Sequence, residues 1–122
     1  MSRAEMVVVV ERDDTAERVG SGDVPVLATP RLLAWAEAAT LKASPVLVEG
    51  QTSVGTRVEL EHRAASPVGT RLTISAELVE ADGRRLAFAV KAVDEHGTVI
   101  GEGRIERAVV DRATFLSRIG NA

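Results

Sequence analysis

Three ionisable side chains fall on otherwise apolar faces, and their types and spacing could support proton-transfer chemistry. Glu37 lies in a stretch of mostly Leu and Ala, with Leu33 and Leu41 four residues away on either side. His62 and Arg107 each fall on the apolar side of a segment in which polar and apolar residues alternate. An unpaired charge in an apolar setting costs several kcal/mol. The three side chains must therefore pair or line a wet cavity, where a histidine that titrates near neutrality can act as a general base.

Each of these side chains also has a purely structural interpretation. On an Ala-rich helix, Glu37 could lie at the edge of a narrow apolar stripe. Near the end of its strand, His62 could be a satisfied histidine at the rim of the core. Arg107 could extend from a sheet edge into water, or pair with Glu106 or Asp111. The joint pattern of three inward polar residues is a stronger signal than any one of them.

Glu37 is positioned by a helix that is predicted from about Pro30 to Ala43. Thr29 directly before Pro30 gives an N-cap residue followed by proline at the first helical position. The helix should stop near Ser44, because the proline that follows biases this residue away from helical angles. The simplest role of Thr29 is therefore that of a helix cap.

His62 and Arg107 are positioned by the first and last of four long strands, which are expected after Gly50, where the apolar period changes from 3.6 to 2. Asp82-Gly83 is a strong hairpin signal between two of them. The face expected to point inward carries Val54, Thr56, Val58, Leu60, His62 and Ala64, then Leu72, Ile74, Ala76 and Leu78, then Leu86, Phe88, Val90 and Ala92, and finally Val99, Gly101, Gly103, Ile105, Arg107 and Val109. Gly55 is expected on the opposite face.

The order of elements predicts an α+β fold in which a curved antiparallel meander of these four strands wraps around one helix. The strands exceed the usual length of roughly 5–6 residues, so the sheet must twist and curve. The one long apolar helix is the element available to cover the concave side. A strand over 4–11 precedes it, and a short helix over 112–119 closes the chain. Gly101 and Gly103 fit a place where helix or ligand approaches the backbone closely.

The composition of the 122-residue chain restricts the class of protein. The length predicts one domain over 1–122, with a core at about 25–111. A net charge of −3 with interleaved signs argues against nucleic acid as a partner. The apolar run Met6–Val10 is too short for a signal peptide or a membrane span, so a cytoplasmic protein without a membrane partner is expected. No cysteine is present for a disulfide or a thiolate, and His62 and His96 form no metal-ligand spacing.

Four stretches of the sequence combine an Ala-Thr before the helix, a Glu eight residues later, a Val-Gly-Thr that opens a strand, a His seven residues after that Gly, and a Glu-Arg-Ala-Val in the last strand. They are VLATPRLLAWAEAA at 26–39, SVGTRVELEHRAASPVG at 53–69, LTISAELVEADGRRLAFAV at 72–90 and IGEGRIERAVV at 100–110. In this combination the chain resembles the hotdog-fold thioesterases, in particular the branch that includes the fluoroacetyl-CoA thioesterase. The resemblance implies catalytic roles for Thr29, Glu37 and His62, an amide contribution from Gly55 and an active-site role for Arg107.

The resemblance also implies an activity, hydrolysis of an acyl-CoA thioester, with coenzyme A as part of the substrate and no cofactor or metal ion. His62 would be the general base, Glu37 would orient it or the water, and Thr29 would position the water or briefly accept the acyl group. Sites in this family lie at a dimer interface, so we expect a homodimer or a dimer of dimers, with His62 and Glu37 from different chains. The cations available for the CoA phosphates are Arg57, Arg71, Arg84, Arg85 and Lys91.

The segment TAERVGSGDVPV at 15–26 departs from the family pattern. Members with fluoroacetyl specificity carry a longer, aromatic lid before the helix, whereas this segment is short, Gly-rich and without an aromatic residue. We therefore expect a small or medium acyl group without fluoroacetyl specificity, and leave open whether CoA or an acyl-carrier protein bears it. The alternative function is a non-catalytic acyl-CoA-binding hotdog module, which would bind such esters without turnover. A hotdog hydratase is disfavoured, because its overhanging Asp/His segment is not found.

Overall fold

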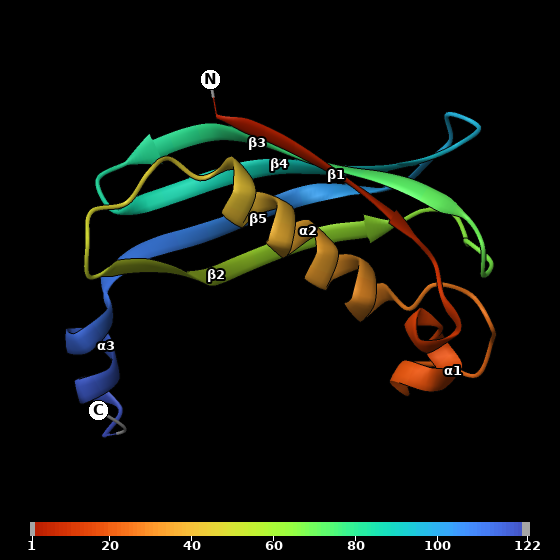
Figure 1. Ribbon diagram of the computed structural model, residues 1–122, viewed down its shortest axis with the longest axis horizontal. Coiled ribbons are helices and arrows are strands. Elements are labelled where there is room, and N and C mark those ends of the chain that lie inside the picture. Colours follow the sequence, from red (N-terminus) through yellow and green to blue (C-terminus); the bar gives the residue numbers. More distant parts are fainter. Residues whose placement is uncertain (1, 121–122) are drawn as a thin grey trace.

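One long antiparallel sheet curves around a central helix in the computed structural model, which describes residues 2–120 (Figure 1). The strands are β1 (Arg3–Val9), β2 (Gln51–His62), β3 (Arg71–Asp82), β4 (Arg85–Asp94) and β5 (Val99–Asp111), and the helices are η1 (Arg12–Asp14), α1 (Ala16–Val19), α2 (Thr29–Ala43) and α3 (Arg112–Arg118). The strand order is β1-β3-β4-β5-β2, and all neighbouring pairs are antiparallel. The predicted α+β architecture is confirmed.

Strand β2 occupies a different place from the one that the predicted meander gave it. Only β3, β4 and β5 follow one another in the sheet, whereas β2 pairs with β5, with Gln51 opposite Asp111 and His62 opposite Gly101. The segment after β2 is tied down elsewhere, since the Ser66 carbonyl accepts a 2.8 Å hydrogen bond from the amide of Leu27. The crossover leaves β2 at a free edge of the sheet, with no partner strand on its outer side among residues 2–120 (Figure 1).

The core forms between the concave side of the sheet and the small side chains of α2. Leu32, Ala36 and Ala39 of the helix are buried against the sheet, and the expected inward residues of β3 and β4 are all in contact with this core. Gly101 allows the close approach that the sequence predicts, because a Cβ there would lie 2.8 Å from Cδ2 of Leu32. A Cβ at Gly103 would instead meet the backbone of the neighbouring strand β2 at the Glu59 carbonyl.

A β-bulge in β2 corrects the predicted faces of that strand. Ser53 pairs with Val109 and Gly55 with Arg107, but the register then shifts by one residue at Thr56. Cross-strand partners share a face, so Gly55 lies on the same inner face as Arg107 rather than on the outer one. The extra residue also turns Thr56 out, and it is exposed. Bulges re-aim side chains in this way, and this one places a glycine at the level of a buried arginine.

The start of α2 also differs from the prediction. The helix ends at Ala43 as expected, but it begins at Thr29, with Ala28 in the N-cap position and no side-chain cap. Pro30 at the second helical position has no N–H to satisfy, which lowers the need for a cap. The Thr29 hydroxyl is therefore free for a tertiary contact.

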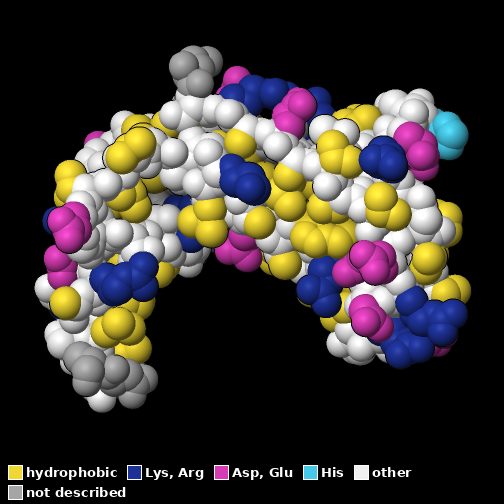
Figure 2. All heavy atoms as spheres, viewed as in Figure 1, with side chains coloured by type: hydrophobic (Ala, Val, Ile, Leu, Met, Phe, Trp, Pro, Cys, Tyr) yellow, Lys and Arg dark blue, Asp and Glu magenta, His cyan; other side chains and the backbone are white. Residues whose placement is uncertain are grey.

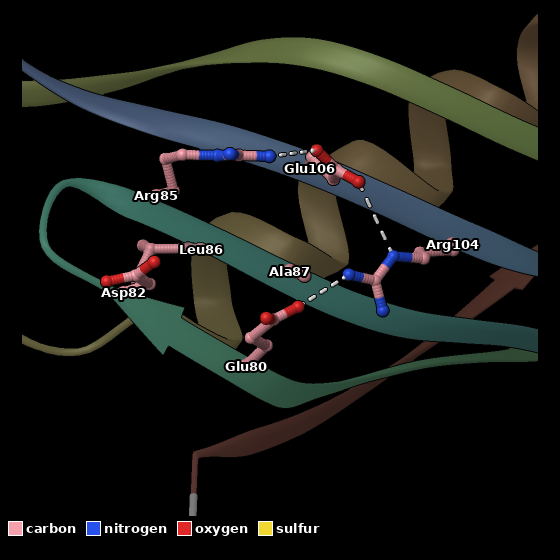
Figure 3. Close-up of a pocket in the computed structure, with 7 residues that line it drawn as sticks. All are labelled: Glu80, Asp82, Arg85, Leu86, Ala87, Arg104 and Glu106. Carbon is pink, nitrogen blue, oxygen red and sulfur yellow. Dashed lines mark hydrogen bonds and ion pairs between the residues drawn. The ribbon is translucent and has the colours of Figure 1, made fainter.

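The convex face of the sheet carries a ladder of ion pairs (Figure 3). Arg104 contacts Glu80 at 2.8 Å and Glu106 at 3.5 Å, and Glu106 also contacts Arg85 at 3.2 Å. These side chains extend over the β3, β4 and β5 surface towards one another and not into the core. Exposed pairs of this kind each contribute about 0–1 kcal/mol. The convex side is thus a charged, solvated face, and Arg85 is already paired with Glu106 there.

The molecule has the outline of an arch, with a hollow under the sheet and α2 (Figure 2). One leg is formed by η1 and α1 and the other by α3, whose first turn is capped by a 2.9 Å bond from the amide of Thr114 to the Asp111 carboxylate (Figure 1). None of the helices described in residues 2–120 has both the length and the apolar character needed to cross a membrane.

Candidate active site

Thr29 and His62 form the first of two polar clusters on the concave side. Thr29, in the first turn of α2, and His62, the last residue of β2, are joined by a 2.7 Å hydrogen bond between Oγ1 and Nδ1. Nε2 of the same ring is buried and has no hydrogen-bond partner among residues 2–120. When Nδ1 accepts the threonine proton, the N–H at Nε2 is left without an acceptor. The cluster is therefore incomplete within one chain.

The environment of His62 favours its neutral form. Burial lowers the pKa of the imidazole from its ordinary value of 6.5, because desolvation disfavours the charged ring. A neutral imidazole at physiological pH is ready to take a proton, which is the state that a general base requires. The other histidine, His96, lies exposed in the turn before β5.

Glu37, Gly55 and Arg107 form the second cluster, near the middle of α2 and the bulge of β2. Arg107 is only 6% exposed, and its guanidinium lies 3.7 Å from the Glu37 carboxylate. It also donates from Nε to Ser53 Oγ at 2.9 Å and from Nη2 to the Ser53 carbonyl at 3.0 Å. Its ion-pair partner is thus Glu37, neither Glu106 nor Asp111. The cluster holds a carboxylate against a fixed cation.

Gly55 makes room for the carboxylate of Glu37. A Cβ at position 55 would lie 2.8 Å from Oε2 of Glu37, so a side chain there would displace the acid. Burial lowers the pKa of Arg107, whereas the charge of Glu37 raises it.

Ser53, the residue that anchors Arg107, was not a predicted site residue. The isolated glycine in the strand pattern was the signal that could have revealed the bulge and the inward turn of Ser53.

The two clusters lie apart within one chain. Thr29 and Glu37 are separated by eight helical residues, or about 12 Å along α2. Gly55 and His62 are separated along β2 by about 20 Å. No hydrogen bond or ion pair joins Glu37 to His62 in the described chain. Both clusters nevertheless lie on the inner face of the same free edge strand.

An open groove adjoins the Thr29–His62 pair. It encloses about 410 Å³, which is within the usual range for a small-molecule site of about 300–1,000 Å³. Small and apolar side chains line much of it, among them Ala16, Val24, Val26 and Ala64. Part of the lining comes from the 15–26 segment, so the chain's departure from the family pattern lies at this groove.

A curved five-stranded antiparallel sheet around a central helix is the architecture of the hotdog fold, which thioester hydrolases share. The family model described as fluoroacetyl-CoA-specific thioesterase matches residues 10–113. The chain therefore belongs to this thioesterase family, and the sequence resemblance and the hotdog fold are both confirmed. It is a thioester hydrolase.

Solved structures agree with this assignment. The fluoroacetyl-CoA thioesterase is 33% identical, with a TM-score of 0.88 over 97% of this chain and 92% of that one. A thioesterase-superfamily member from Thermus thermophilus is 31% identical, with a TM-score of 0.89 over 97% and 88% of the two chains. A variant of the first enzyme was solved in complex with acetyl-CoA; it is 31% identical, with a TM-score of 0.89 over 97% and 93%. No curated protein sequence matched.

Proposed function

We propose that this chain hydrolyses small or medium acyl-CoA thioesters at a site shared by two copies, with Thr29 and His62 from one and Glu37, Gly55 and Arg107 from the other. One observation carries the proposal: both clusters lie on the free edge strand, one with an unsatisfied ring nitrogen and the other with a partly exposed carboxylate. His62 has a buried ring nitrogen, Nε2, without a hydrogen-bond partner among residues 2–120. Glu37 is 38% exposed although it adjoins a buried arginine. The N–H at Nε2 of His62 lacks an acceptor, and the carboxylate of Glu37 is one.

The geometry of β2 supports one way of joining the copies. After the bulge, the inward residues are Val58, Leu60 and His62, and residues paired across two strands share a face. If the free edges of two β2 strands pair in antiparallel fashion with Glu59 on the two-fold axis, Val58 lies opposite Leu60 of the second chain. His62 then lies opposite the Gly55 bulge of the second chain, where the Glu37 carboxylate is held.

The charges on the outer side of β2 favour this register over one with the axis at Leu60. Arg57 would lie opposite Glu61 of the second chain, and Glu61 opposite Arg57, so two attractive pairs form across the axis. Arg57 also holds Glu59 of its own chain at 3.2 Å, which offsets the approach of the two Glu59 side chains. Moving the axis to Leu60 would instead place Glu59 opposite Glu61, a repulsive pair. Edge pairing also covers a strand whose backbone is open.

The proposed reaction uses both clusters together. A water held by Thr29 loses a proton to Nδ1 of His62, directly or through the hydroxyl, and the resulting hydroxide attacks the thioester carbonyl. Backbone N–H groups at the start of α2 and near Gly55 hold the oxyanion. The C–S bond then breaks, and His62 returns the proton to the thiolate. Glu37 of the second chain accepts a hydrogen bond from Nε2 and stabilises the imidazolium, while Arg107 fixes Glu37.

A proton-NMR titration of the imidazole tests the contact between Glu37 and His62. In Glu37→Gln, burial acts without the opposing carboxylate, so His62 is expected to titrate below 6.5. In the unsubstituted protein the carboxylate raises the pKa, and the midpoint is expected at higher pH than in the variant. His96→Ala assigns the two signals. A midpoint that Glu37→Gln leaves unchanged would show that the two groups do not meet.

A hydrolysis screen tests the proposed activity. The full chain is assayed with one acyl-carrier-protein thioester and with a series of acyl-CoA esters: acetyl-, fluoroacetyl-, medium-chain, aromatic and long-chain. The expected result is turnover of small or medium acyl-CoA without preference for fluoroacetyl, because the groove beside His62 lacks an aromatic lid. Saturable binding without turnover of any ester would instead support the alternative, a binding module. The cytoplasmic location, the single domain and the absence of a cofactor stay predictions.

A further inference from the structure

We propose that the groove between α3 and the end of the sheet binds the phosphorylated adenosine of coenzyme A. The inference rests on the proposed function and names the part of the protein that recognises the carrier. The groove encloses about 390 Å³ and is lined by Arg84, Val109, Val110, Asp111, Thr114, Phe115 and Arg118. Most of these residues belong to the end of β5 and to α3, which leaves the sheet at that end (Figure 1).

The groove contains the two cations best placed for phosphate. Arg84 and Arg118 have no ion-pair partner among residues 2–120. In contrast, Arg57 pairs with Glu59 and Arg85 with Glu106. Guanidinium groups bind phosphate oxygens through two parallel hydrogen bonds. Arg84 is therefore better placed to bind phosphate than Arg57 and Arg85, which are already paired.

The one acid in the groove has a structural role. The Asp111 carboxylate accepts the amide of Thr114 at 2.9 Å and caps α3. Its pKa is lowered, first by the hydrogen bonds from Thr114 and also by the charge of Arg84. With two guanidinium groups against one carboxylate in its lining, the groove keeps a net positive charge. Figure 2 shows cationic and hydrophobic side chains together on this leg of the arch.

The groove lies near the second cluster along β5. Val109, which lines it, follows Arg107 by two residues on the inner face of β5, or about 7 Å along the strand. The amide of Val109 donates a 2.8 Å hydrogen bond to the Arg84 carbonyl, which fixes the turn bearing Arg84 at this level. A thioester held at Gly55 could therefore extend its pantetheine arm along β5 into the groove.

Phe115 favours a nucleotide over other anions. Its side chain lines the groove and is 36% exposed, although it is one of only two phenylalanines in the chain. Flat bases stack on aromatic rings and guanidinium planes. A ring beside two arginines fits an adenine that carries phosphates. An acyl-carrier protein presents the pantetheine arm without adenosine, so it would leave this groove unused.

The test measures the nucleotide separately from the reaction. With the best acyl-CoA of the screen, Arg84→Gln and Arg118→Gln are each expected to raise KM about tenfold, the effect of losing one charge-assisted hydrogen bond, with kcat unchanged. The matching acyl-N-acetylcysteamine thioester, which lacks the nucleotide, should show no change. Arg12→Gln, which removes the same charge from an exposed position in η1, outside the groove, is the control. Calorimetry with adenosine 3′,5′-bisphosphate should show weaker binding in both groove variants.

The outcomes separate this inference from the proposed function. Turnover of acyl-CoA with KM and nucleotide binding unchanged in both groove variants overturns the inference and leaves the enzyme assignment intact. Nucleotide binding that is weakened by the variants in a protein without turnover supports the groove and overturns the proposed reaction. A rise in KM only for the acyl-carrier-protein thioester also overturns the inference, because the groove would then recognise the carrier protein.

Discussion

Replacing His62 by Ala is expected to lower kcat for acyl-CoA hydrolysis by about 10²–10⁴-fold, the range that a positioned general base contributes. Its Nδ1 lies 2.7 Å from the Thr29 hydroxyl, and burial keeps the ring neutral and able to take a proton. No other imidazole can substitute, because His96 lies in an exposed turn outside both clusters. His96→Ala is the matched control and should retain full activity.

In the same assay, Glu37→Ala is expected to lower kcat by about 10²–10⁴-fold as well. The imidazolium would lose the carboxylate that stabilises it, and Arg107 would lose its counter-ion. Glu95→Ala, beside the exposed turn, is the control for a lost carboxylate. Thermal unfolding of each variant shows whether the fold is kept. Folded variants of both residues with unaltered turnover would remove the basis for the mechanism.

Much of the fold could be predicted because buried apolar residues recur in the sequence with the period of the strand or helix that carries them. The inward residues of β3 and β4 follow a strict period of two, and they form the core as expected. The same reasoning placed Arg107 inside, where it is buried. A polar residue that breaks an apolar period is thus informative, since the sheet cannot turn one residue away without a bulge.

The parts that could not be predicted depend on contacts between distant segments. An N-cap is a local rule, but the Thr29 hydroxyl bonds to a histidine 33 residues later, so a tertiary contact overrode the local preference. The pairing of β2 with β5 rather than β3 is likewise a long-range choice. The bulge at Thr56 reversed the predicted face of Gly55. Sequence reasoning identified residues that point inward, but not which of them meet within one chain.

The most direct test of the shared site uses mixed dimers purified through two different tags. In one mixture His62→Ala is paired with Glu37→Ala, so that one of the two sites keeps both residues if they come from different chains. The expected activity is about half that of the unsubstituted dimer, although each variant alone is nearly inactive. In the second mixture, an unsubstituted chain is paired with a chain carrying both substitutions. This dimer should be inactive, because each of its sites lacks at least one residue.

A site contained within one chain predicts the reverse. The first mixture would then be inactive, and the second would keep about half of the activity, because the unsubstituted chain would carry a complete site. That pair of results, measured as acyl-CoA turnover per dimer, would contradict the account; recovery in the first mixture and loss in the second is the result it predicts.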